Sequence, residues 1–132
     1  MSVEFEISDV IPSTPDSVYL AWLDSDEHTR MTGDKARVSA VAGEPFKAWG
    51  GYIQGRNLEL ETGKRILQSW RTSDFEDSEP DSILEILLKP EGSGTRVTIR
   101  HSNVPPHGMQ YQQGWIDSYF TPMKEYFGKK PE

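Results

Sequence analysis

His101 is the residue of this 132-residue chain that is best placed to take part in chemistry. It shares its alternation with Val97 and Ile99, which predicts that its imidazole points to the inward face of a strand. An inward imidazole could orient a polar group of a ligand or act as a base. We favour a simpler interpretation, a buried histidine hydrogen-bonded to the backbone or to a tyrosine of a helix, because catalysis needs a partner residue that the sequence does not indicate.

The other histidines and the acidic residues offer weaker prospects for chemistry. His28 follows Glu27 on a predicted helix, and adjacent helical positions point in different directions, so we expect a solvated helix surface rather than a metal site. His107 lies between proline and glycine, which is typical of an exposed turn. The acidic run at residues 74–81 lacks the central glycine and final glutamate of an EF-hand loop, so a solvated hairpin loop is expected. We predict no metal site.

The chain has no cysteine, which removes disulfide bonds, thiolate nucleophiles and thiolate metal ligands together. It also lacks a Gly-x-Ser-x-Gly nucleophile motif, a phosphate-binding loop and a dinucleotide-binding glycine pattern, and its glycine pairs are typical of turns. We therefore predict no catalytic residues and no cofactor.

The most distinctive element that could position a site is residues 110–127, which are predicted to form one long terminal helix with an apolar arc of roughly 180°. A helix that only packs on a core needs an arc of little more than about 100°. We therefore expect one side of the arc to seal the core and the other, whose rings carry polar atoms, to face a pocket or a partner. The core side comprises Ile116, Phe120, Met123 and Phe127, and the other side comprises Tyr111, Trp115, Tyr119 and Tyr126.

Pro122 predicts a kink in this helix. It cannot donate a hydrogen bond to the Ser118 carbonyl oxygen, and its ring crowds the preceding turn. A kink would bend the helix around a curved sheet or widen one entrance of a pocket. A proline that is tolerated without any role is an equal alternative.

The elements that precede this helix are predicted to be strands and two short helices. Alternation predicts the first strand at residues 3–7, and cap residues predict helices at 15–23 and 24–31. Six further strands are predicted between turns, at residues 36–40, 44–48, 52–61, 64–72, 82–89 and 95–103. The register of the longest one stays open unless Gly55 or Asn57 marks a bulge. This order predicts an α+β fold in which a curved seven-stranded antiparallel sheet and a long C-terminal helix leave a pocket between them.

Composition bounds the class of protein. The length suits one core, so we expect a single domain over residues 1–132. No apolar run is long enough to cross a membrane and the first residues lack a secretory signal, so a cytoplasmic protein is expected. A net charge of −7 without a basic cluster disfavours nucleic acid and membrane surfaces as partners.

Several short motifs, in a fixed order, resemble a known family. They are Gly50-Gly51-Tyr52-Ile53-Gln54-Gly55, Lys64-Arg65-Ile66-Leu67-Gln68-Ser69-Trp70-Arg71, Gly94-Thr95-Arg96-Val97, Val104-Pro105, Gly114-Trp115, Pro122-Met123-Lys124 and Tyr126-Phe127-Gly128. Over nearly the whole chain, the sequence resembles the C-terminal-type domain of the activator of heat shock protein 90 ATPase. The resemblance implies the helix-grip fold of the START-like superfamily (SRPBCC, birch-pollen-allergen-like), which often holds an apolar ligand between sheet and helix.

From the apolar helix and the implied fold we expect a non-catalytic binding module for a small, mostly apolar ligand held between the sheet and the C-terminal helix. The residues expected around the ligand are Phe46, Trp70, Leu84, Ile86, His101, Trp115, Tyr119 and Met123. The first alternative is a co-chaperone-like or stress-response regulator that binds a heat-shock ATPase or another protein. In the full co-chaperone a separate N-terminal domain makes the main chaperone contacts, and this chain begins at the first strand of the C-terminal-type domain. The second alternative is a cyclase or hydrolase of the START-like superfamily; no oligomeric state is predicted.

Overall fold

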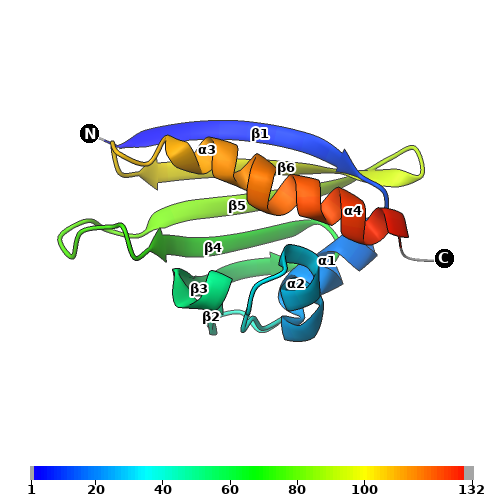
Figure 1. Cartoon of the computed structure of the whole chain (residues 1–132), viewed down its shortest axis with the longest axis horizontal. Helices are drawn as coiled ribbons and strands as arrows, with labels where there is room; N and C mark the ends of the chain where they lie inside the picture. The colour runs from blue at the N-terminus through cyan, green and yellow to red at the C-terminus, as the bar shows by residue number, and fades with distance from the viewer. Residues whose placement is uncertain (1, 130–132) are drawn as a thin grey trace.

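The computed structural model describes residues 2–129 and shows one sheet with helices packed against it (Figure 1). In chain order the elements are β1 (Val3–Ile11), α1 (Pro15–Leu23), α2 (Ser25–Thr32), β2 (Pro45–Ala48), the 3₁₀ turn η1 (Trp49–Gly51), β3 (Ile53–Glu61), β4 (Arg65–Thr72), β5 (Ser82–Glu91), β6 (Gly94–Val104), α3 (Gln110–Trp115), the π-helical turn η2 (Ile116–Phe120) and α4 (Thr121–Lys129). The predicted α+β order of a strand, two helices, further strands and a long helix is confirmed. Within these described residues, no helix is long and apolar enough to cross a membrane.

The sheet has six strands in the order β1-β6-β5-β4-β3-β2, and every neighbouring pair is antiparallel. The prediction of seven strands is wrong by one, because residues 36–40 form only a single bridge to β2. Backbone N–H groups of this segment donate to side-chain hydroxyls of α2 instead of to a neighbouring strand. Ser25 Oγ accepts from the Val38 N–H at 2.9 Å, and Thr29 Oγ1 accepts from the Ala36 N–H at 3.0 Å. The segment is thus tied to a helix instead of extending the sheet.

β3 contains a bulge at one of the two positions that the sequence suggested. The register to β4 shifts between Asn57 and Glu59, and the Asn57 side chain is fully buried. Its Nδ2 donates to the carbonyl oxygens of Ser39 and Val41, at 2.8 and 3.1 Å. Its Oδ1 accepts from Gln68 Nε2 at 2.9 Å. The bulge settles the register of this strand and ties the segment before β2 to the sheet.

The two short helices begin where their cap residues predict. Thr14 Oγ1 accepts from the Ser17 N–H at 3.2 Å, and Asp24 Oδ1 accepts from the Glu27 N–H at 3.0 Å. α2 ends at Thr32 and is capped by Gly33, whose left-handed backbone (φ 86°) is a conformation that glycine adopts readily. These caps define where α1 and α2 begin and where α2 ends.

The terminal helix consists of α3, η2 and α4 in succession and crosses the sheet (Figure 1). Just before Pro122, where the sequence predicts a kink, the helix contains the π-helical turn η2, in which the Thr121 N–H bonds to the Ile116 carbonyl oxygen five residues back. The wider turn comes just before the proline, whose ring and missing N–H are incompatible with a regular α-helical turn. The helix begins at Gln110, as predicted, and ends at Lys129, two residues after its predicted end.

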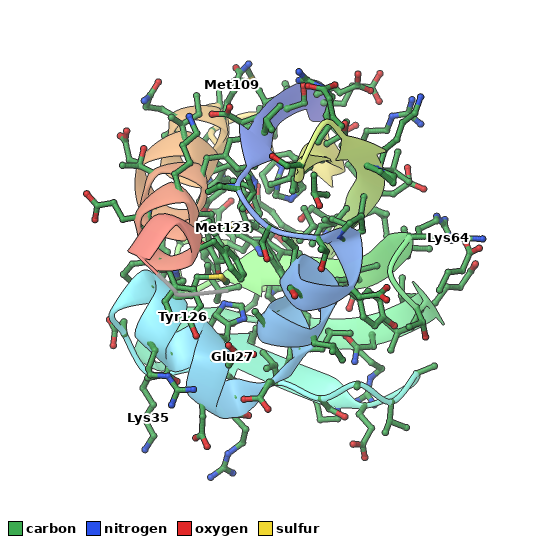
Figure 2. The ribbon with its side chains drawn as sticks, turned by 90° about the vertical axis from the view of Figure 1, so that its right-hand side faces the viewer. Glu27, Lys35, Lys64, Met109, Met123 and Tyr126 are labelled. Atoms are coloured by element: carbon green, nitrogen blue, oxygen red, sulfur yellow. The ribbon has the colours of Figure 1, made fainter. Side chains whose placement is uncertain are left out.

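The core lies between the sheet and the helices. The sheet contributes aliphatic side chains that are at most 7% exposed, namely Ile66, Leu84, Ile86, Leu88, Val97 and Ile99. Three of the four side chains predicted to seal the core are buried, namely Phe120, Met123 and Phe127. The fourth, Ile116, is half-buried and packs at the edge of the core. Figure 2 shows Met123 between the terminal helix and the sheet.

Tyr126 connects the end of the terminal helix to α2. It is half-buried, and its hydroxyl donates to Glu27 Oε1 at 2.7 Å. Figure 2 shows the two side chains meeting between α4 and α2. The predicted polar-handled side of the helix therefore meets another element of the same chain at this point.

Candidate functional site

A cleft opens between the terminal helix and the part of the sheet formed by β3 and β4. Its volume is about 400 Å³. Strand side chains form one wall, side chains of α3 and η2 form the other, and η1 contributes an indole. The lining is mostly aromatic with a few polar groups, and comprises Asp34, Trp49, Tyr52, Ile53, Trp70, Gln110, Tyr111, Gly114, Trp115, Ser118 and Tyr119.

The rings of the cleft contact one another in a continuous series. The Trp70 and Trp115 ring centroids are 5.6 Å apart, and those of Trp115 and Tyr119 are 4.9 Å apart. Trp22 of α1, which is not on the lining, stacks on Tyr119 from behind at 4.8 Å. Rings at these distances attract one another. Ring contacts, including the contact with Trp22 behind the lining, therefore hold the wall of the cleft in place.

Trp49 is placed on the lining by an unusual turn. Its backbone is left-handed (φ 53°), and Gly50 and Gly51 follow with φ of 67° and 99°. A left-handed conformation costs a residue with a side chain about 1–2 kcal/mol, and such strain collects at functional sites. The indole meets the Tyr119 ring edge-on, with centroids 6.4 Å apart. Its Nε1 is shielded from solvent but makes no well-formed hydrogen bond.

His28 contradicts the predicted solvated helix surface, because it is buried beneath the terminal helix. Its Nδ1 lies 2.8 Å from the Trp22 carbonyl oxygen, which can only accept, so Nδ1 carries the proton. Its Nε2 then accepts from the Tyr119 hydroxyl at 2.9 Å. Met31, one turn later on the same helix face, is also buried. The spacing of these two residues was the signal in the sequence for a buried face.

His101 is inward and fully buried, as predicted, but its partners are Trp115 and Ser82. Trp115 Nε1, which can only donate, lies 3.1 Å from His101 Nδ1. His101 Nε2 therefore carries the proton and donates to Ser82 Oγ at 2.8 Å. Ser82 Oγ in turn donates to the Trp70 carbonyl oxygen at 2.8 Å. The chain of hydrogen bonds fixes Trp115 from behind the cleft.

The two buried imidazoles are neutral and fully bonded. Burial lowers the pKa of His101 to about 3. Burial also lowers the pKa of His28, although the bond to the Trp22 carbonyl opposes this. The unprotonated nitrogen of each ring already accepts a hydrogen bond from an indole or a hydroxyl. Neither imidazole can take a proton from a ligand without breaking one of these bonds.

The hydroxyls of the lining tyrosines Tyr52, Tyr111 and Tyr119 are hydrogen-bonded to residues outside the lining. Burial raises the pKa of Tyr119, and the Trp49 indole opposes the shift. Burial and the bond to Asp74 raise the pKa of Tyr52, which donates to Asp74 Oδ2 at 2.6 Å. Tyr111 and Thr72 share a hydrogen bond of 2.6 Å. The raised pKa values keep Tyr119 and Tyr52 neutral at pH 7.

The structure brings three of the eight predicted ligand-binding residues to the cleft: Trp70, Trp115 and Tyr119. His101 lies behind Trp115, to which it is bonded. The remaining four are elsewhere: Leu84, Ile86 and Met123 are at most 1% exposed within the core, and Phe46 lines a separate surface hollow beside β2. The sequence-based list omitted Trp49 and Tyr52, although the consecutive glycines that follow Trp49 signalled a special turn.

The acidic loop between β4 and β5 is held by Arg71 and His107. Arg71 donates to the carbonyl oxygens of Glu76 and Glu79 at 3.1 Å and pairs with Asp81 at 2.8 Å. His107, in an exposed turn as predicted, lies 2.8 Å from Glu79 Oε1; this bond raises the pKa of His107 and lowers that of Glu79. Among the described residues, no group of three or more histidine or acidic side chains is arranged to hold a metal ion.

The fold and the cleft define a class of protein, an α+β domain in which an antiparallel sheet and a long C-terminal helix border an aromatic site. Residues 12–128 match the family described as Activator of Hsp90 ATPase homolog 1-like protein, and the chain belongs to this family. Among curated proteins, none matches the sequence.

Solved structures share the fold over nearly the whole chain. An Hsp90 activator from Plasmodium falciparum superposes with a TM-score of 0.84 at 21% identity, covering 95% of this chain and 96% of that one. An Aha1 dimer from Colwellia psychrerythraea superposes with a TM-score of 0.79 at 18% identity, covering 97% of this chain and 99% of that one. CalU16 from Micromonospora echinospora superposes with a TM-score of 0.79 at 22% identity, covering 97% of this chain and 78% of that one. At these identities the likeness establishes the fold alone.

Proposed function

We propose that this protein is a non-catalytic binding module and that a small, mostly apolar ligand occupies the aromatic cleft. The observation that carries the proposal is the cleft itself, with a volume of about 400 Å³ and rings from both the sheet and the helix. Small-molecule sites commonly have volumes of about 300–1,000 Å³, apolar walls and a few fixed polar groups. The strained Trp49 turn supports the proposal, since it places an indole on the lining at a conformational cost.

The hydrogen bonds around the cleft support binding rather than catalysis. A general base needs a lone pair that can reach the ligand. Tyr119 donates to His28, and Trp115 donates to His101, so both imidazoles hold the walls in place. The ionisable lining residues that remain are tyrosines and one exposed aspartate. Their arrangement suits the recognition of a ring and its substituents.

Gly114→Leu is expected to block the cleft while preserving the fold. A side-chain carbon added at Gly114 meets no atom within 4 Å, so leucine enters open space on the lining. We expect the affinity for 1-naphthalenemethanol, measured by isothermal titration calorimetry, to fall at least about tenfold because the leucine occupies the ligand's space. The melting temperature should stay the same or rise, since leucine favours a helix over glycine by about 0.5–1 kcal/mol.

The matched control is Gly128→Leu. Gly128 also lies in the terminal helix and also has open space around an added carbon, but it is exposed and not on the lining. This variant should bind the naphthalene probe like the original protein. Equal affinities for all three proteins, or binding by none of them, would refute the proposed use of the cleft.

A second candidate function is regulation of a heat-shock ATPase through direct protein contact. Membership of the Hsp90-activator-like family favours it, as does the structural likeness to a protein described as an Hsp90 activator. The test is the ATPase rate of the Hsp90-type chaperone from the same organism, with and without a molar excess of this protein. We expect at least about a twofold stimulation if this function holds. An unchanged rate together with no co-purification would reject it.

A further inference from the structure

We propose that the ligand of the cleft is an organic cation, in which an ammonium group is attached to a flat apolar ring. This inference rests on the proposed function and adds the charge of the ligand to it. It comes from the chemistry of the lining: aromatic faces, one carboxylate at the mouth, and no lysine, arginine or histidine among the lining residues that the structure describes.

Asp34 supplies the carboxylate. It is exposed, its Oδ1 accepts from the Lys35 N–H at 2.7 Å, and a carbon added at Gly50 would lie 3.8 Å from the same oxygen. The carboxylate therefore stands beside the strained turn that presents Trp49. A ligand whose ring enters among the indoles can keep its charged end at this mouth, in contact with both Asp34 and water.

A second carboxylate adds to the negative electrostatic potential near the cleft. Asp74 Oδ2 accepts from the hydroxyl of Tyr52, a lining residue, at 2.6 Å. The negative charge of Asp74 is thus one hydrogen bond beyond the lining. The chain as a whole carries a net charge of −7, which favours cations over anions in solution around it.

The rings act in the same direction. Three tryptophans (Trp49, Trp70 and Trp115) and three tyrosines line the cleft, and the face of an aromatic ring attracts a cation. An anionic ligand would instead meet the Asp34 carboxylate and several aromatic rings, with no lining cation to pair with. A cation therefore gains from the same groups that would repel an anion.

A group of positive side chains near the η1 turn belongs to a different surface. Lys35, Arg37 and Lys47 line the hollow beside β2, together with Phe46 and the two glycines of the η1 turn. Figure 2 shows the Lys35 side chain extending outward from the molecule, away from Met123 and the core. The turn thus divides a cationic hollow from the aromatic cleft, whose own lining contains only the aspartate as a charged group at neutral pH.

Three naphthalene compounds that differ in charge test the inference by calorimetry at pH 7: 1-naphthylmethylammonium, 1-naphthalenemethanol and 1-naphthoate. We expect the ammonium compound to bind about fivefold tighter than the alcohol, and the carboxylate to bind weakest. The preference for the ammonium compound should shrink as salt is raised from about 20 to 500 mM, since the Debye length then falls.

Asp34→Asn should weaken ammonium binding about threefold more than it weakens alcohol binding. Asp77→Asn, which removes an exposed carboxylate from the β4–β5 loop, is the matched control and should change neither. Equal affinities for the alcohol and the ammonium compound, or tighter binding of 1-naphthoate, would overturn the charge inference and leave the proposed function standing. Failure of all three compounds to bind would overturn both.

Discussion

Trp115→Ala is expected to lower the free energy of unfolding by about 4 kcal/mol, which is a large part of the stability of a domain of this size. The indole is 3% exposed and contacts the rings of Trp22, Trp70 and Tyr119. Its removal leaves a cavity that the surrounding rings cannot fill, and it also leaves His101 Nδ1 without its donor. Urea unfolding followed by far-ultraviolet circular dichroism measures the loss without relying on tryptophan fluorescence.

Trp115→Phe separates the hydrogen bond from the packing. Phenylalanine keeps an aromatic ring but cannot donate to His101 Nδ1, so we expect a loss of about 1–2 kcal/mol from the missing bond, on top of a smaller loss from reduced ring size. An alanine variant that loses less than about 1 kcal/mol would contradict the role of Trp115 as the centre of the ring cluster. A phenylalanine variant as damaged as the alanine variant would also contradict it.

Acidification from pH 7 to pH 5 is expected to cost the folded state about 2 kcal/mol through His101 alone. The unfolded histidine takes up a proton below its ordinary pKa of 6.5, whereas burial holds the folded pKa at about 3. The unfolded state therefore binds more protons throughout this window, and stability falls as pH falls. The buried His28 has a lowered pKa and adds a loss of the same sign. Urea unfolding at half-unit pH intervals measures the slope.

His101→Gln should flatten this pH dependence, because glutamine does not titrate, even though the variant is less stable at pH 7. The matched control is His107→Gln. His107 is exposed and has a raised pKa, so its contribution to stability has the opposite sign: it is present at low pH and lost as pH rises. Glu79, whose pKa is lowered by its bond to His107, titrates below the range from pH 7 to pH 5. A slope that stays the same in His101→Gln would contradict the lowered pKa that burial gives His101.

Much of the fold follows from local patterns in the sequence. Thr14 and Asp24 cap the first two helices, and alternation defines β5 and β6 with their buried aliphatic faces. The error at residues 36–40 came from a long-range effect. A β-prone stretch can pair with a strand or with side-chain hydroxyls, and only the position of α2 decides that Ser25 and Thr29 take its backbone bonds.

The site was less accessible to prediction than the fold. Strand parity separates inward from outward residues, but a core residue such as Leu84 and a cleft residue such as Trp70 share the inward face. Position along the strand and coverage by the helix decide which of them lines a cavity. His28 shows the same limit, because an imidazole among charged neighbours is polar in sequence yet buried once Tyr119 lies over it.

The measurement that most directly tests the central claim is a nuclear magnetic resonance titration of the indole N–H signals with 1-naphthalenemethanol. The chain has four tryptophans; Trp49, Trp70 and Trp115 line the cleft, and Trp22 lies behind it. We predict saturable shifts of the three lining signals with one common affinity, a smaller shift of Trp22, and loss of all shifts in Gly114→Leu. Unchanged signals, or shifts that persist in Gly114→Leu, would contradict ligand binding in the aromatic cleft.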